Sequence, residues 1–228
     1  MSLYLAVELC ALAIPLAFSF DRKVAYFRMW PFLLPAILIN AVLFIGLDIY
    51  FTSKGTWGFN PEYHSRLVIA GLPVEELLFF IIIPYCSLFV HYVFVAYLPR
   101  TALSTLAARI VSLAVILLLV ITAILSCNRA YTAFYSLLTA GIVILAWTTS
   151  LQMLSRYYLT FLIILIPFLL VNSILTGSFI DGEVFWYNNA DISGIRLFSI
   201  PVEDVLFGFS LILLNLVIAE SFRKLIKR

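Results

Sequence analysis

The sequence has few charged residues, and this shortage sets the first limit on its fold. Only 11% of its 228 residues are charged, whereas 64% are hydrophobic. Soluble domains carry about 25% charged residues, so a water-soluble globular fold is excluded. The net charge of +2 is too small, and the charges are too dispersed, for nucleic-acid binding. What remains is a polytopic membrane protein, in which each buried charge needs a physical reason.

Sequence motifs for nucleotide, metal and disulfide chemistry are also missing. The nine glycines form no G-x-G-x-x-G and no P-loop. No D-x-x-x-D run is present to hold a magnesium diphosphate, which argues against a prenyltransferase. The two histidines, His64 and His91, show no metal-binding spacing. The cysteines are isolated, so we expect packing residues rather than disulfides at Cys10, Cys86 and Cys127. We therefore expect no metal and no cofactor.

Seven apolar runs are long enough to cross a bilayer as helices. A crossing helix needs about 20 such residues, and none of these runs alternates as a strand would. The expected spans are 3–20, 30–50, 73–97, 104–125, 131–150, 157–176 and 201–221. The predicted fold class is all-α: a polytopic membrane helical bundle with about seven transmembrane helices.

The charges are divided unequally between the two sides of this bundle. Ten basic residues fall on one side: Arg22, Lys23, Arg28, Arg100, Arg109, Arg156, Arg223, Lys224, Lys227 and Arg228. Only four fall on the other: Lys54, Arg66, Arg129 and Arg196. The positive-inside rule then predicts a multi-pass protein of the cell membrane with a cytoplasmic C-terminus and an outer N-terminus. Nine of the twelve acids gather at or near the outer side: Asp48, Glu62, Glu75, Glu76, Asp181, Glu183, Asp191, Glu203 and Asp204.

The chain contains an internal repeat. Residues 73–79 read PVEELLF and residues 201–207 read PVEDVLF, a shift of 128 residues. Upstream, Asn40 and Asp48 correspond in order to Asn172 and Asp181, with small insertions. We therefore expect two parallel three-helix repeats, 1–98 and 128–228, joined by a linker helix within 99–127 into one membrane domain. Their pseudo-symmetry axis should follow the membrane normal, so both motifs open helices at the same face.

Each repeated motif places a proline and two acids at the start of a helix. Proline suits the first helical position and acids suit the positive end of the helix dipole, so a well-made helix start is one explanation. A duplication that serves packing alone is another. The same helix start occurs twice at membrane depth, and further acids lie nearby, which favours a chemical role for the acids of the motif. Carboxylates that share a proton in an apolar pocket supply a general acid and a general base. If Glu75 and Glu203 face each other across the pseudo-axis, their titrations would couple.

Other polar and aromatic residues near the motifs are candidates for substrate binding or for orienting the acids. Adjacent helical residues point about 100° apart, so Glu75 and Glu76 cannot both face one narrow cavity. Phenylalanine rings just inside the motifs pack, and their faces can also stabilise a nearby cation. The candidates of both kinds are Asn40, Asp48, Asn172, Asp181, Phe79 and Phe207.

Paired three-helix units that each open their last helix on Pro-x-Glu-(Glu/Asp) resemble the integral-membrane lycopene cyclases. The chain looks like a fused form of the two-subunit bacterial enzymes and is similar to the cyclase portion of the fungal bifunctional phytoene synthase and lycopene cyclase. The resemblance covers essentially the whole chain. It implies redox-neutral cyclisation of the linear ends of lycopene, usually into β-rings, without a cofactor. By motif match it assigns catalytic roles to Glu75 and Glu203, with Glu76 and Asp204 tuning or sharing the proton.

The resemblance also implies partners, and several alternatives remain beside it. The expected partners are a lipophilic carotenoid, lycopene, the lipid bilayer that dissolves it, and other carotenoid enzymes. One alternative is a cyclase of another acyclic carotenoid, with C50 length or ε- or γ-type ends. A proton-coupled transporter would also have intramembrane carboxylates and a repeat. Against it, the acids cluster near one face and the repeats are parallel. A non-catalytic scaffold for carotenoid enzymes is the third alternative.

Overall fold

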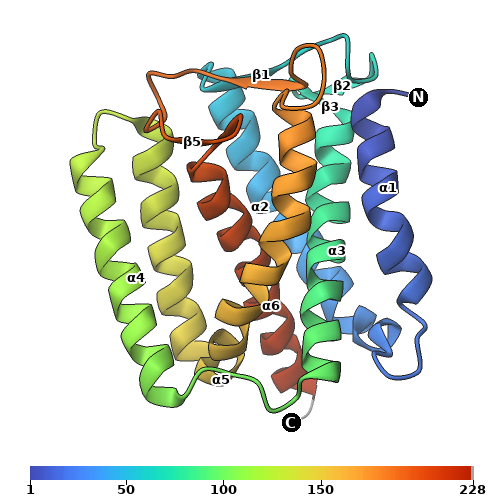
Figure 1. The fold of residues 1–228 in the computed structure, drawn as a ribbon, viewed down its shortest axis with the longest axis vertical. Coiled ribbons are helices and arrows are strands. Elements are labelled where there is room, and N and C mark those ends of the chain that lie inside the picture. The colour runs from blue at the N-terminus through green and yellow to red at the C-terminus, as the bar shows by residue number, and fades with distance from the viewer. Residues whose placement is uncertain (227–228) are drawn as a thin grey trace.

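Helices make up most of the chain in the computed structural model, which describes residues 1–226. They are α1 (Leu3–Phe18), the 3-10 helix η1 (Tyr26–Met29), α2 (Trp30–Ser53), α3 (Val74–Tyr97), α4 (Thr105–Leu125), α5 (Ala130–Leu175) and α6 (Glu203–Ile226). They lie side by side, and α6 ends at the opposite end of the bundle from the start of α1 (Figure 1). The predicted all-α bundle of membrane type is confirmed. The expected basic side includes Lys227 and Arg228, which lie outside the described residues.

The helices differ from the seven expected spans in two places. Within residues 1–226, five helices are long and apolar enough to cross a membrane: α2 together with η1, α3, α4, α5 and α6. The expected span 3–20 is too long, because α1 has 16 residues. At about 1.5 Å per residue it extends roughly 24 Å, less than the hydrocarbon core of about 30 Å.

The second difference concerns spans 131–150 and 157–176, which both fall in α5, a helix of 46 residues. Only Ser150 has non-helical dihedral angles, φ −163° and ψ 97°. The chain reverses direction at this break, so the two halves of α5 run in opposite directions along the bundle (Figure 1). The Ser150 hydroxyl accepts the backbone N–H of Met153 at 3.2 Å, which caps the second half of α5. A single capped residue thus replaces the six-residue connection that the sequence predicted.

Within residues 1–226, six short strands lie in the loops at the end of the bundle where α1 begins (Figure 1). β1 (Trp57–Phe59) pairs antiparallel with β4 (Phe185–Tyr187). β2 (Val68–Ile69) pairs with β3 (Leu72–Pro73), and β5 (Arg196–Leu197) pairs with β6 (Ile200–Pro201). The second and third pairs are hairpins that lead directly into α3 and α6. Apolar periodicity did not predict these strands, because each has only two or three residues.

The loops of the two halves exchange reciprocal hydrogen bonds. The backbone N–H of Asn60 donates to the carbonyl of Val184 at 2.8 Å. The N–H of Asn188 donates to the carbonyl of Thr56, also at 2.8 Å. Donors and acceptors are related by the same shift of 128 residues that relates the two motifs. The loops therefore join the halves by equivalent contacts, while the exact boundaries of the repeats stay a prediction.

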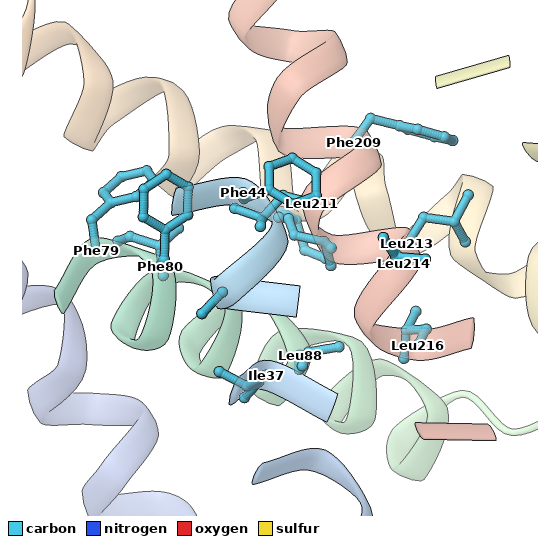
Figure 2. Packing of buried hydrophobic residues seen from close by; sticks show 14 of the residues in the cluster. Ile37, Phe44, Phe79, Phe80, Leu88, Phe209, Leu211, Leu213, Leu214 and Leu216 are labelled. Carbon is cyan, nitrogen blue, oxygen red and sulfur yellow. The ribbon is translucent and has the colours of Figure 1, made fainter. Parts of the chain in front are cut away.

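The core between α2, α3 and α6 consists of aromatic and aliphatic side chains. Phe44, Phe80, Leu88, Leu211 and Leu213 are buried there, and Figure 2 shows how they pack. In a bilayer, lipid tails are as apolar as these side chains, so close packing rather than removal from water stabilises the helix contacts.

The three cysteines are free thiols in different environments. Cys86 on α3 is partly buried, whereas Cys10 on α1 and Cys127 after α4 are exposed. The prediction that all three are packing residues is therefore wrong for Cys10 and Cys127.

Candidate active site

Three acidic side chains from three different helices line one small cavity, named here the acid pocket. They are Asp48 on α2, Glu76 on α3 and Asp204 on α6. All three side chains belong to residues that are 8% exposed or less. The cavity volume is about 40 Å³. The acid pocket therefore brings together carboxylates from both halves of the chain.

Asp48 and Glu76 each accept a hydrogen bond from one aromatic side chain. The indole Nε1 of Trp57 donates to Oδ1 of Asp48 at 2.6 Å. The hydroxyl of Tyr4, in the first turn of α1, donates to Oε2 of Glu76 at 2.6 Å. The other oxygen of Asp48, Oδ2, is buried without a hydrogen-bond partner. Each acid is thus held at one oxygen by a neutral donor.

Asp204 is held at both of its oxygens by tyrosine hydroxyls. Tyr131, in the first turn of α5, donates to Oδ1 at 3.1 Å, and Tyr187 on β4 donates to Oδ2 at 2.8 Å. Burial raises the pKa of Tyr187 well above its usual value, and the neighbouring Asp204 raises it further. Tyr187 therefore stays protonated and remains a donor near neutral pH.

The other acid of each motif points away from the acid pocket. Oε1 of Glu75 accepts the hydroxyl of Ser2 at 2.6 Å and the backbone N–H of Ser65 at 2.7 Å. Oε1 of Glu203 accepts the hydroxyl of Thr132 and the backbone N–H of Ser193, both at 2.5 Å. Both acids therefore connect the loop before their helix to the start of α1 or α5.

Glu75 and Glu203 consequently do not face each other across a shared cavity, as the sequence had led us to consider. Neither residue lines the acid pocket, whereas Glu76 and Asp204 do. The physical reason is the rotation of about 100° between adjacent helical residues, which sends the two acids of one motif toward different neighbours.

Aromatic rings enclose the acid pocket. Phe79 and Phe207, which the sequence placed beside the acids, both line it, and their ring centroids are 6.3 Å apart. Phe80 lines it as well, and Figure 2 shows Phe79 and Phe80 together on α3. The Phe44 ring packs edge-on against Phe207 at 5.7 Å. The walls of the acid pocket are thus apolar apart from the acids, their donors and Asn172.

Of the remaining candidates, one lines the acid pocket and two do not. Asn172 on α5 lines it and donates to the carbonyl of Phe168 at 2.9 Å. Asn40 donates to the carbonyl of Leu211 at 2.8 Å and is not part of the lining. Asp181 is exposed in the loop after α5.

The helices therefore bring Asp48 and Asn172 to one cavity, whereas Asn40 and Asp181, their counterparts in sequence order, lie outside its lining. The loop between α5 and β4 spans residues 176–184, whereas the loop between α2 and β1 spans only 54–56. The extra residues lie in this loop, so a match by sequence order does not align the two helices.

Sequence reasoning missed the donors that hold the acids. Tyr4 and Tyr131 are each the second residue of a helix, one in each half of the chain. This recurrence is a signal that could have identified them. Tyr187 and its contact with Asp204 could not be found in this way, because they depend on the pairing of β1 with β4.

In the described part of the chain, no Lys, Arg or His side chain forms an ion pair with the carboxylates of the acid pocket. Among residues 1–226, the ion pair between Arg223 and Glu220 is the only salt bridge, and both residues belong to the last turns of α6. Nor does any group of His, Cys, Asp and Glu side chains within these residues have the arrangement of a metal site.

These features define a class of protein: a helical bundle of membrane type with buried carboxylates from both halves in one aromatic pocket. The family model described as lycopene cyclase matches residues 1–94 and 128–222. The chain therefore belongs to the lycopene cyclase family, as its resemblance predicted, and its substrate class is the lipophilic carotenoids. The matched segments leave out 95–127, which contain α4. No curated protein sequence and no solved structure matches the chain significantly.

Proposed function

We propose that this family member is a lycopene cyclase that forms β-ionone rings by proton-initiated, redox-neutral cyclisation in the acid pocket. The observation that carries the proposal is the meeting of Asp48, Glu76 and Asp204 in one buried aromatic cavity. Cyclisation consumes one proton and releases another, so it needs an acid and a base at the same place. A group of carboxylates supplies both roles.

The reaction balances within this group. One carboxyl gives its proton to the terminal double bond of lycopene, which leaves a tertiary carbocation. The neighbouring alkene closes on the cation, and a carbon–carbon bond forms. A carboxylate then takes a proton from the new ring, which leaves a ring double bond. No electrons are exchanged with an external oxidant or reductant, and the total number of protons on the protein is unchanged.

The surroundings of the acids support this chemistry. An unpaired carboxylate is costly in apolar surroundings, and a proton held within the group offsets this cost. The hydroxyls of Tyr4, Tyr131 and Tyr187 hold Glu76 and Asp204 in fixed orientations. The rings of Phe79 and Phe207 exclude water that would trap the cation, and their faces attract positive charge.

The two acids outside the pocket have a different role in this proposal. Glu75 and Glu203 fix the loops before α3 and α6 through the backbone N–H groups of Ser65 and Ser193. They are positioning residues, while Glu76, Asp204 and Asp48 contact the reacting end of the substrate.

Expression in a lycopene-accumulating bacterial host tests the proposal. Pigments extracted from the cells are resolved by chromatography and compared with β-, ε- and γ-ring standards. We expect lycopene to be converted into products with β-rings. Unchanged lycopene beside well-expressed protein would contradict the proposal. Products with ε- or γ-type ends, or conversion of a C50 precursor only, would support the alternative cyclases. Proton flux in liposomes without cyclisation would support the transporter.

A further inference from the structure

A second, larger cavity lies between α1, α3 and the second half of α5, and is named here the lateral groove. Its volume is about 650 Å³, within the range of roughly 300–1,000 Å³ for small-molecule sites. Its walls are almost entirely apolar, with Ala6 and Ala11 on α1, Ile83 on α3 and Val171 on α5. The groove therefore fits an apolar occupant.

The lateral groove meets the acid pocket at one residue. Asn172 lines both cavities. One turn earlier on α5, Phe168 lines the groove and packs against α6 at Gly208, where an added Cβ would lie 2.8 Å from the Phe168 ring. An elongated molecule in the groove would thus have one end beside the acids.

The groove opens on the outer surface of the bundle. Ile14 on α1 and Leu170 on α5 line it and are 66% and 59% exposed. Both lie within apolar helices, so the neighbouring medium is lipid rather than water. A molecule dissolved in the bilayer could therefore enter sideways between α1 and α5.

The corresponding space in the other half of the bundle is filled by aromatic rings. There, α2, the first half of α5 and α6 contribute Phe44, Tyr135 and Phe207, and the Tyr135 and Phe207 centroids are 5.5 Å apart. Phe44 and Tyr135 are both fully buried. Ile14 and Leu170 in the lateral groove are exposed by contrast.

We propose that the lateral groove binds the linear polyene chain of the carotenoid while one end of the molecule reacts in the acid pocket. This inference rests on the proposed function. Because the groove meets the acid pocket at Asn172, the protein processes one end of the substrate at a time, and a second cyclisation requires the molecule to leave and re-enter in the reverse direction.

Thiol labelling tests occupancy independently of turnover. Cys10 lines the groove and is exposed. The matched control is Ala13→Cys, because Ala13 lies on the same helix, is exposed and is not part of the groove lining. Both thiols are reacted with N-ethylmaleimide in liposomes with and without lycopene, and modification is followed by peptide mass spectrometry. We expect lycopene to slow labelling of Cys10 several-fold and to leave residue 13 unaffected. Equal labelling of Cys10 with and without lycopene would overturn the proposal.

Substitution of a small groove residue gives the second readout. Ala11→Phe places a ring in the groove, and Ala13→Phe places the same ring outside it. We expect Ala11→Phe to lower cyclisation at least about tenfold, since displaced substrates react far more slowly. Ala13→Phe should act as the wild type does. Full activity of well-expressed Ala11→Phe would overturn the groove proposal and leave the cyclase function intact. An inactive wild type would instead contradict the cyclase function, whatever the labelling shows.

Discussion

Trp57 and Tyr187 are directly opposite each other in the β1–β4 pair, and each donates a hydrogen bond to a different acid of the acid pocket. Trp57 bonds Asp48 of α2 at 2.6 Å, and Tyr187 bonds Asp204 of α6 at 2.8 Å. β1 comes from the first half of the chain and β4 from the second. The strand pair therefore places donors from both halves over the same cavity.

Tyr187→Phe removes the hydrogen bond to Oδ2 of Asp204 and keeps the ring. Hydrogen bonds to charged groups contribute about 1.5–3 kcal/mol, so we expect cyclisation to fall by about tenfold or more. Lycopene conversion per unit of membrane protein measures the effect. Tyr63→Phe is the control, since its hydroxyl bonds the backbone of Asp181 outside the acid pocket. Equal losses in both variants would show that loop stability, rather than Asp204, explains the effect.

Asp204→Asn leaves the acid pocket with a side chain of the same shape that cannot exchange a proton. General acid–base groups contribute about 10²–10⁴-fold to rate, and we expect a loss in that range. Glu76→Gln should behave similarly. The control is Glu220→Gln, which changes a carboxylate in the last turns of α6. Wild-type conversion by Asp204→Asn would remove this residue from proton transfer.

Glu203→Ala separates the positioning role from proton transfer. It leaves the N–H of Ser193 without its acceptor, and an unsatisfied buried donor costs about 1–3 kcal/mol. The expected result is a lower unfolding temperature in detergent, whereas Glu203→Gln, which keeps an acceptor oxygen, should stay near the wild type and retain measurable activity. If Glu203→Gln were inactive and Asp204→Asn active, Glu203 would be the residue that transfers the proton, as the motif match implied.

Gly208→Ala adds a methyl group 2.8 Å from the Phe168 ring. Overpacking of this kind costs about 1–3 kcal/mol, and Phe168 lines the lateral groove, so we expect its ring to relieve the contact by moving into the groove. We expect lower thermal stability together with slower cyclisation. Gly141→Ala provides the comparison, because nothing lies within 4 Å of a Cβ at that helical position. A fully stable and active Gly208→Ala would show that Phe168 is free to move elsewhere.

Reporter fusions test the proposed orientation in the cell membrane. The end of α6 carries the basic residues Arg223 and Lys224, so the positive-inside rule predicts a cytoplasmic C-terminus. A reporter that is active only in the cytoplasm should function when fused after residue 228. Activity of a periplasmic reporter at the same position would reverse the orientation and place the acid pocket near the inner face.

The sequence predicted the helices better than it predicted their connections. Long apolar runs identify α2, α3, α4 and α6 to within a few residues, because a bilayer requires continuous helix. The sequence could not show that Ser150 alone separates the two halves of α5. A one-residue helix break with an N-cap and a short loop have nearly the same amino-acid composition, so composition does not distinguish them.

The internal repeat identified the acids of the two motifs, but it did not show which acid of each motif lines the acid pocket. The motif identifies Glu75, Glu76, Glu203 and Asp204 equally well. Which acid of each pair enters the shared cavity depends on the rotation of α3 and α6 about their axes, which packing decides. Sequence order matched Asp48 with Asp181 but did not show that only Asp48 lines this cavity, because extra loop residues follow α5.

Gly58 and Trp186 are paired at the centre of β1 and β4, and this pair fixes the register in which the strands of the two halves align. A Cβ at residue 58 would lie 2.5 Å from the Trp186 ring, so the indole needs a glycine opposite it. Sliding the strands by one residue would place Trp57 or Phe59 under the indole and would turn every side chain to the other face. Tyr187 would then lose Asp204, and Trp57 would lose Asp48. The close packing at Gly58 thus excludes shifted strand registers, in which the carboxylates would lack their hydrogen-bond donors.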